Sequence, residues 1–203
     1  SDYVLADRIV IPDGYERFYG EKVVRLPDSY YPTDDTLCGA EKTPTRAELG
    51  LPENGLVFCC FNNNFKIRPG VFDVWMRLLR DISDSVLWLL KDNDIAAANL
   101  QREAEHRGVT PSRLVFAPRA PLGQHLARQR RADLFLDTFP YNAHTTGSDA
   151  LAMGLPIITM SGETFASRVG ESLLNAVGLP ELVTRTIEDY EGLCRNLATR
   201  SEE

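Results

Sequence analysis

The chain has 203 residues, 43% of them hydrophobic and 25% charged, and its formal net charge is −7. This composition predicts one globular α/β domain plus a small extra piece, and it excludes disordered, fibrous and membrane-spanning proteins. The negative charge argues against general binding to nucleic acid or an anionic membrane. A phosphate-bearing ligand would therefore depend on local Lys or Arg side chains.

Residues 1–50 differ in pattern from the rest of the chain. Three short runs, 3–6, 8–12 and 22–26, are β-like, and residues 27–36 are rich in Pro, Asp and Tyr, which is typical of a loop or linker. Thr45 is placed to cap a short helical turn over 45–49. The segment has too few apolar residues for its own core, so we expect it to pack against the remainder or to stay partly mobile.

From residue 51 onward, strand-like and helix-like patterns alternate. The expected strands cover 56–61, 85–90, 113–117, 133–136 and 156–160. The expected helices cover 69–82, 95–106, 121–131, 146–153, 166–177 and 187–198. This alternation predicts a Rossmann-like parallel sheet with helices on both faces. Such a sheet binds ligands beyond the carboxyl ends of its strands, which directs attention to the loops there.

The four cysteines are Cys38, Cys59, Cys60 and Cys194, and they form no C-x-x-C pair. Cys59 and Cys60 fall inside an apolar run and should be core thiols on opposite faces of a strand. Free thiols suit a reducing compartment, and no signal peptide is visible, so we expect a cytoplasmic protein. Because the chain starts at Ser1 and not at Met, we also expect it to be part of a longer protein.

The loop over 137–149 carries the strongest chemical signal. Thr145 and Thr146 would begin a helix, where free N–H groups and the positive end of the helix dipole favour an anion. The neighbouring His144 and Gly147 strengthen this interpretation. Asp149, one turn later, could accept hydrogen bonds from ribose hydroxyls. The alternative is that either threonine is simply a helix cap.

Two further loops supply candidate residues. In the loop over 62–69, Lys66 could reach a diphosphate, although an exposed lysine without function is an equal alternative. In the segment 118–128, His125 and Arg128 share a helix face and could flank a base. Their spacing alone favours a solvated basic face, because Arg130 and Arg131 follow directly.

The sequence also contains a weak metal-binding pattern. Asp92 and Asp94 follow a hydrophobic strand as Asp-x-Asp, a pair that could hold a divalent cation. We favour the interpretation that Asp94 caps the next helix, so no metal site is expected. No P-loop, dinucleotide-binding glycine turn or nucleophile elbow is present.

Four segments together resemble the O-linked N-acetylglucosaminyltransferases and the related SPINDLY proteins. They are FCCFNNNFKI at 58–67, SVLWLL at 85–90, DTFPYNAHTTGSD at 137–149 and GETFASRV at 162–169. The resemblance implies the two-lobed GT-B architecture. Residues 51–203 would be the C-terminal, nucleotide-sugar-binding lobe, and residues 1–50 the tail of the first lobe and the linker. It also implies a tetratricopeptide array, outside this chain, that recruits the protein acceptor.

The resemblance also implies roles for individual residues. Lys66 would bind the diphosphate and stabilise the leaving group, and Asn63 would donate to phosphate. The other implied contacts lie along the rest of the donor. Ala120 would read the uracil edge through its backbone, His125 and Arg128 would pack beside the uracil, His144, Thr145 and Thr146 would hold ribose and phosphates, and Asp149 would hold the ribose hydroxyls.

Two positions depart from the animal enzymes of this family. Leu122 replaces a ribose-contacting lysine, and Tyr141 replaces a cysteine near the sugar. The first change removes a cation, so uridine affinity could be lower or the donor could differ.

The implied reaction is transfer of N-acetylglucosamine from UDP-GlcNAc to Ser or Thr of proteins, with inversion and without metal or other cofactor. No convincing general base is found in the sequence. An O-fucosyltransferase using GDP-fucose and a non-catalytic nucleotide-sugar-binding or scaffold protein remain alternatives.

Overall fold

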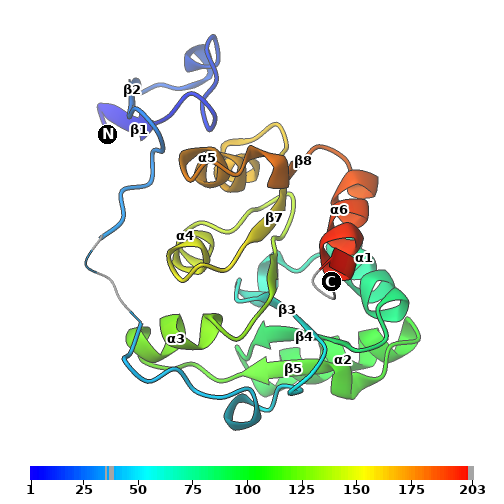
Figure 1. The fold of residues 1–203 in the computed structure, drawn as a ribbon. Coiled ribbons are helices and arrows are strands. Elements are labelled where there is room, and N and C mark those ends of the chain that lie inside the picture. The colour runs from blue at the N-terminus through cyan, green and yellow to red at the C-terminus, as the bar shows by residue number, and fades with distance from the viewer. Residues whose placement is uncertain (35, 37–38, 201–203) are drawn as a thin grey trace.

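The computed structural model describes residues 1–34, 36 and 39–200 (Figure 1). Its main feature is a six-stranded parallel sheet with the order β5-β4-β3-β6-β7-β8. The strands are β3 (Leu56–Cys60), β4 (Ser85–Leu90), β5 (Leu114–Ala117), β6 (Leu134–Leu136), β7 (Ile157–Met160) and β8 (Val183–Thr184). The predicted parallel α/β sheet is therefore confirmed.

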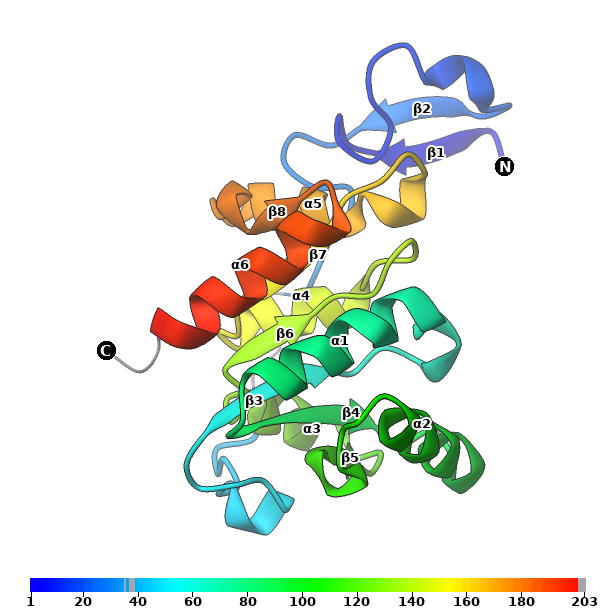
Figure 2. The ribbon, with the colours of Figure 1, turned by 90° about the vertical axis from the view of Figure 1, so that its right-hand side faces the viewer.

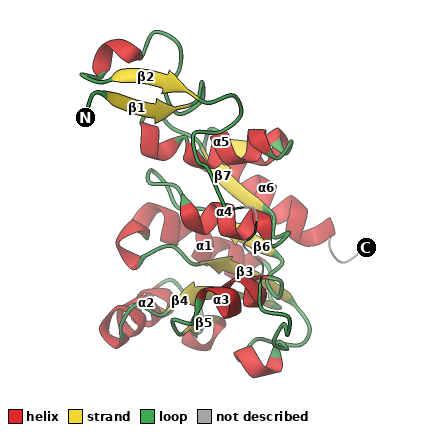
Figure 3. Cartoon of the chain, turned by 90° about the vertical axis from the view of Figure 1, so that its left-hand side faces the viewer, coloured by secondary structure: helices red, strands yellow, loops and turns green. Residues whose placement is uncertain are grey.

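Six α-helices cover the two faces of this sheet. They are α1 (Pro69–Asp81), α2 (Asp94–His106), α3 (Leu122–Gln129), α4 (Thr145–Ala152), α5 (Val169–Ala176) and α6 (Ile187–Arg200). Helices α1, α2 and α6 lie on one face (Figure 2), and α3, α4 and α5 lie on the other (Figure 3). After β5, which is an edge strand, the chain crosses to the other face of the sheet. Helix α3 on that face leads back to β6, which pairs with β3.

The core explains why the helices form where the sequence predicts them. Pro69 opens α1, and Val71, Trp75 and Leu78 from this helix are each at most 1% exposed. The strands contribute a continuous apolar layer that includes Cys59 and Cys60, both buried as free thiols. Cys194 in α6 is also buried and free, whereas Cys38 lies outside the described residues.

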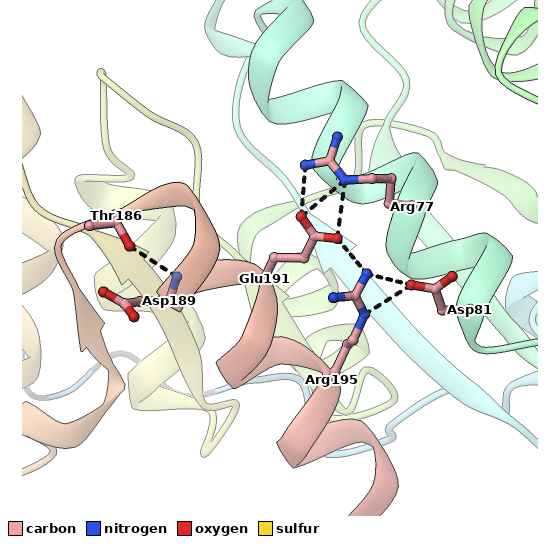
Figure 4. A network of polar contacts seen from close by, with 6 residues as sticks. All are labelled: Arg77, Asp81, Thr186, Asp189, Glu191 and Arg195. Carbon is pink, nitrogen blue, oxygen red and sulfur yellow. Dashed lines mark hydrogen bonds and ion pairs between the residues drawn. The ribbon is translucent and has the colours of Figure 1, made fainter.

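Helix α6 is fastened to α1 by an ion-pair network (Figure 4). Arg77 of α1 donates hydrogen bonds to the Glu191 carboxylate at 2.7–3.1 Å. Arg195 joins Glu191 to Asp81. The start of α6 is capped by Thr186, whose hydroxyl accepts a hydrogen bond from the Asp189 N–H at 3.0 Å.

Residues 1–31 form a small unit outside the six-stranded sheet. Strands β1 (Tyr3–Ala6) and β2 (Lys22–Arg25) pair in parallel as a two-stranded sheet. The expected strand over 8–12 is wrong. The Asp7 carboxylate accepts hydrogen bonds at 2.8 Å from the N–H groups of Ile9 and Val10, and these bonds fold the backbone into a turn.

Residues 1–50 contact the α/β unit in two places. Val10 and Ile11 pack with Val169 and Leu173 of α5 in a second apolar cluster, and the Ser172 hydroxyl donates to Asp7 at 2.6 Å. These contacts agree with the expectation that the segment packs against the rest of the chain.

The second contact with the α/β unit is made near the C-terminal end of this segment. Arg46 forms an ion pair with Asp133 at 2.7 Å, beside β6, and the Ala40 N–H donates to the Gly123 carbonyl oxygen at 2.8 Å. Thr45 and Glu48 exchange hydrogen bonds around the 3₁₀ turn Ala47–Leu49, as the capping pattern predicts.

The remaining differences from the predicted elements are local. Strand β8 was not predicted, because its two residues are too few to produce a periodic pattern. The expected helix over 166–177 is divided into the 3₁₀ turn Phe165–Ser167 and α5. Thr164 and Ser167 form a capping box that holds this turn. In the described part of the chain, no helix has the length and apolarity needed to cross a membrane.

Candidate functional site

The loop after β6 is organised around a carboxylate that sequence reasoning missed. Asp137 is fully buried and accepts hydrogen bonds from the Ala143 N–H (2.6 Å), the Thr138 N–H (2.8 Å) and the Thr159 hydroxyl (2.7 Å). Burial raises the pKa of Asp137 to about 6, while these bonds oppose the rise. A buried aspartate at a strand end fixes the path of the loop toward α4.

A second missed residue, Asn62, connects that loop to the neighbouring strand. Its amide donates to the Thr138 hydroxyl at 2.8 Å, and its carbonyl oxygen accepts a hydrogen bond from the Thr146 hydroxyl. Asn62 is 1% exposed. It therefore fixes Thr146 relative to the end of β3, and its position within a run of three asparagines gave no signal to separate it from Asn63.

The start of α4 carries His144, Thr145 and Thr146. His144 occupies the N-cap position, but no side chain caps the helix, so its first N–H groups are not satisfied by a side chain. The His144 ring is half-buried, and burial first and then Lys66 lower its pKa to about 4. The imidazole is therefore neutral at pH 7. Thr145 is exposed at the helix end.

Lys66 lies in the 3₁₀ turn Asn64–Lys66, on the loop after β3. Its ammonium donates a hydrogen bond to the Asn142 carbonyl oxygen at 2.8 Å and lies 3.9 Å from the centre of the Tyr141 ring. Burial lowers the pKa of Lys66, and the nearby Asp137 opposes that change. Within the described residues, Lys66 forms no ion pair, so its charge is available to an anion.

The predicted base-binding residues line one cavity of about 400 Å³. Its lining residues are Phe61, Asn63, Leu90, Arg119, Ala120, Leu122, His125, Arg128 and Thr146. The structure thus brings together five predicted site residues from the loops after β3 and β5, from helix α3 and from the start of α4. Lys66, His144 and Thr145 do not line this cavity, although Lys66 and Asn63 share one loop and the two threonines are adjacent.

Arg128 is the buried cation of this cavity. It is 4% exposed, donates to the Pro118 carbonyl oxygen at 2.6 Å, and lies 5.0 Å from the Phe61 ring centre. Its second amino group is 2.7 Å from His125 Nδ1. Burial, followed by Arg128, lowers the pKa of His125 to about 4, so this imidazole is neutral at pH 7. The Arg128 Nε–H has no hydrogen-bond partner in the described ranges.

Asp149 lies apart from the residues expected to share its ligand. It lines a separate cavity of about 210 Å³ with Thr33, Asp34 and Ser148. Burial raises its pKa. The structure therefore does not place Asp149 in the cavity of His125 and Arg128.

A larger cavity, of about 480 Å³, lies behind the Arg128 side chain. It shares Ala120 and Arg128 with the predicted base cavity and is closed on another side by Ala40, Pro44 and Leu49. Trp88 also lines it, and the indole N–H of Trp88 has no partner among the residues that are described. Arg128 thus separates two adjoining spaces.

The Asp-x-Asp pattern has other partners in the structure. Asp92 pairs with Arg119 at 2.9 Å, and Asp94 pairs with Lys91 at 2.6 Å. The expected cap is wrong by one residue, because the Asn93 side chain, not Asp94, accepts the hydrogen bond from the Ala96 N–H at 2.8 Å. Residues 1–34, 36 and 39–200 contain no group of three acidic, His or Cys side chains that could hold a metal ion.

Comparison with known proteins gives a consistent result. The sequence model of glycosyl transferase family 41 matches residues 39–203. The chain is 35% identical, over 97% of its length, to the Arabidopsis thaliana protein named probable UDP-N-acetylglucosamine--peptide N-acetylglucosaminyltransferase SEC, and covers 21% of that relative. It is 34% identical, over 98% of its length, to a SPINDLY protein of Petunia hybrida and covers 21% of it.

A solved structure agrees with this result. A mutant O-GlcNAc transferase of Thermobaculum terrenum has a TM-score of 0.82 and 34% identity, and the match covers 97% of this chain and 37% of that chain. The chain spans about a fifth of the length of the curated relatives named above. The expected GT-B architecture and the resemblance to O-GlcNAc transferases and SPINDLY proteins are confirmed. The chain belongs to glycosyl transferase family 41.

Proposed function

We propose that this chain binds the nucleotide-sugar donor in a protein that transfers N-acetylglucosamine from UDP-GlcNAc to Ser or Thr hydroxyls of other proteins. The observation that carries the proposal is the cavity of about 400 Å³ in which Asn63, Ala120, His125, Arg128 and Thr146 meet. The resemblance implies donor-binding roles for these five positions, and relatives at 35–40% identity are named as UDP-N-acetylglucosamine peptide transferases.

The base would lie in this cavity. A neutral imidazole and a guanidinium without an ion-pair partner suit a flat, uncharged ring that offers carbonyl oxygens, as uracil does. Ala120 would offer its backbone to the edge of the base. Leu122 lines the same cavity and is 51% exposed, so no cation reaches the ribose from this position.

The diphosphate would lie toward α4 and Lys66. The free N–H groups at the start of α4 and the Thr145 hydroxyl are donors for phosphate oxygens, whereas the Thr146 hydroxyl already donates its proton to the Asn62 carbonyl oxygen. We assign His144 to the same region, and Asp149 to the ribose once the donor is bound. Lys66 would stabilise the negative charge that develops as the bond between the sugar and the diphosphate breaks.

The reaction would invert the anomeric carbon in a single displacement. The acceptor hydroxyl attacks this carbon from the face opposite the diphosphate, loses its proton, and the diphosphate departs. Lys66 and the start of α4 would supply the neutralising charge, so we propose that no metal ion is required. We assign the proton acceptor to the first lobe or to the phosphate of the donor, because the cavity itself is lined by no carboxylate.

We further propose that residues 1–50 are the tail of the first lobe and the linker, and that residues 51–203 are the donor-binding lobe. The exposed side chains of Tyr3 (59%), Leu5 (53%) and Phe18 (67%) support this assignment, since a further lobe would cover them. The protein acceptor would be recruited by tetratricopeptide repeats outside this chain. The free thiols of Cys59, Cys60 and Cys194 support a reducing compartment, the cytoplasm.

The test is calorimetric titration of the chain with UDP, GDP, UDP-GlcNAc and GDP-fucose. We expect UDP and UDP-GlcNAc to bind more tightly than the guanine nucleotides. Preferential binding of GDP-fucose would instead support a fucosyltransferase. Binding of UDP-GlcNAc without any transfer by the longer protein would support a non-catalytic role.

A further inference from the structure

Two tyrosines from the Pro-, Asp- and Tyr-rich loop that follows β2 reach the start of α4. The Tyr31 hydroxyl forms a hydrogen bond with the Thr145 hydroxyl, and the Tyr30 hydroxyl lies 3.4 Å from His144 Nδ1. Tyr30 and Tyr31 are separated from these partners by 114 residues. A stretch that the sequence describes only as a loop therefore contacts the two residues at which an anion would bind.

Tyr30 holds this contact in place. Its N–H donates to the buried Asp7 carboxylate at 2.8 Å, and its ring packs against Phe165 with ring centres 4.9 Å apart. Burial raises the pKa of Tyr30 well above its ordinary value, so its hydroxyl keeps its proton. The Tyr31 ring packs edge-on against Tyr30 at 5.8 Å. The position of the Tyr31 hydroxyl is thus set by packing against half-buried rings and by the buried Asp7 carboxylate that holds Tyr30.

The bond between Tyr31 and Thr145 has a preferred direction. The phenolic O–H is a more acidic group than an aliphatic hydroxyl and is therefore the stronger hydrogen-bond donor. When Tyr31 donates, the Thr145 oxygen is the acceptor and the Thr145 proton stays free. Thr145 is exposed at the first position of α4, where no side chain caps the helix. Its free proton then points to the same ligand as the first N–H groups of the helix.

We propose that Tyr31 is a positioning residue for the nucleotide-sugar donor, which orients the Thr145 hydroxyl to donate to the diphosphate. The proposal rests on the proposed function, because it assigns the diphosphate to the start of α4. The proposal places part of the donor site in the N-terminal segment, in the loop that follows β2. The donor site is then assembled from both parts of the chain.

The test compares Tyr31→Phe with Tyr19→Phe by calorimetry, using UDP and uridine as probes. Tyr31→Phe removes one hydroxyl and should weaken UDP binding by about three- to tenfold, the range for one hydrogen bond. Uridine affinity should not change, because uridine has no phosphate. Tyr19 is a matched control: it packs partly buried in the same apolar cluster, and its hydroxyl has no hydrogen-bond partner among the described residues.

A double-mutant cycle tests whether Tyr31 affects UDP binding through the Thr145 hydroxyl. In a Thr145→Val background, Tyr31→Phe should have no further effect on UDP binding, because the hydroxyl that it orients is gone. Unchanged UDP affinity in Tyr31→Phe, or equal weakening of UDP and uridine, would overturn the proposal. Failure of the proposed function is distinguishable, since the unaltered chain would then bind neither UDP nor uridine.

Discussion

In the proposed function, the Lys66 side chain is the cation that would meet the leaving diphosphate. Its ammonium is half-buried between the Tyr141 ring and the Asn142 carbonyl oxygen, and burial lowers its pKa. These two contacts fix the position of the Lys66 ammonium without an ion-pair partner in the described part of the chain. It therefore needs little rearrangement to meet a phosphate.

We predict that Lys66→Ala weakens UDP binding by about 1.5–3 kcal/mol, the range for a charge-assisted hydrogen bond. Folding should be little affected, since the side chain pairs only with a carbonyl oxygen and a ring face. Calorimetric titration measures the affinity, and thermal unfolding checks the fold. Lys22→Ala is the control, because Lys22 is an exposed residue of β2. Equal UDP affinity in Lys66→Ala and the unaltered chain would remove Lys66 from the site.

The base cavity leads to a second prediction. Phe61, His125 and Arg128 pack on one another, with the His125 and Phe61 ring centres 5.1 Å apart, so the walls are fixed in advance. UDP should bind at least about tenfold more tightly than GDP, which corresponds to about 1.4 kcal/mol. Competition titrations of the two nucleotides give the ratio directly. A ratio near one, or a preference for GDP, would contradict the assignment of these residues to uracil.

Single residues could be proposed for the site from the sequence where they lie near a strand end and carry a recognisable chemistry, as Lys66 and Thr146 do. His125 was favoured only by the resemblance, because its spacing alone indicates a solvated face. Asp137 and Asn62 gave no signal, because their place in the loops depends on burial and on partners from other strands. The contact of Tyr31 with Thr145 spans more than half the chain and leaves no local pattern. Asp149 was assigned to the same ligand, but its separation from the cavity of His125 and Arg128 depends on the facing direction of one helix turn.

Among the secondary-structure elements, α6 shows most directly how helix packing is secured. It buries Tyr190 and Cys194 in the core, and its polar side is attached to α1 through Glu191. Hydrogen bonds from Arg77 are the main cause of the lowered pKa of Glu191, with burial acting in the opposite direction. A carboxyl with a lowered pKa stabilises the fold above its unfolded-state pKa, and this contribution is lost as pH falls through the folded-state value.

Glu191→Gln should therefore lower the free energy of unfolding by about 1–2 kcal/mol at pH 7, an amount reduced by the partial exposure of both arginines. The difference from the unaltered chain should shrink at acid pH, as the pH falls through the lowered pKa of Glu191 and its carboxylate becomes protonated. Urea denaturation at pH 7 and along a series of acid pH values measures the difference. Glu188→Gln, in the first turn of the same helix but exposed and without an ion pair in the described residues, should have a smaller effect, about 0.3–1 kcal/mol from the helix dipole. A pH-independent loss would indicate a packing defect instead.

The elements predicted from sequence are those with a long periodic pattern. Helices α1 and α2 and strands β3 and β4 appear within one residue of the expected bounds. In α1 the apolar residues recur at helical spacing, and β3 and β4 are continuous apolar runs of strand length. Strand β8 and the turn after β1 were not predicted. In the first case two residues carry no period, and in the second the carboxylate of Asp7 overrides β propensity.

The whole molecule consists of an α/β unit with a docked N-terminal segment. Residues 1–31 contact α5 and α4, and residues 40–48 contact α3 and the start of β6. In the proposed function, the loops at the strand ends would hold the donor, and the first lobe of a two-lobed protein would supply the surface that holds the acceptor.

We therefore predict that this chain alone transfers no measurable sugar to a protein or peptide, while a longer protein with the first lobe does. Holding donor and acceptor together in attack geometry can supply about 7–11 kcal/mol of the barrier, and one lobe cannot do this. A radiolabelled UDP-GlcNAc assay with the same acceptor compares the two. Robust turnover by the 203-residue chain would place the complete catalytic apparatus within it.

The two-stranded sheet of β1 and β2 affects how the chain behaves at high concentration. Each strand has one neighbour in the described structure, so each has an open edge whose backbone groups can pair with another molecule. Tyr3, Leu5 and Phe18 add an apolar surface beside these edges. The strands are only four residues long, and Lys22 and Arg25 place charges on β2, which limits edge-to-edge pairing. Self-association of this chain would therefore begin at the edges of β1 and β2 and would increase with protein concentration. These edges lie apart from the cavity of His125 and Arg128, so such association would leave ligand binding unaffected.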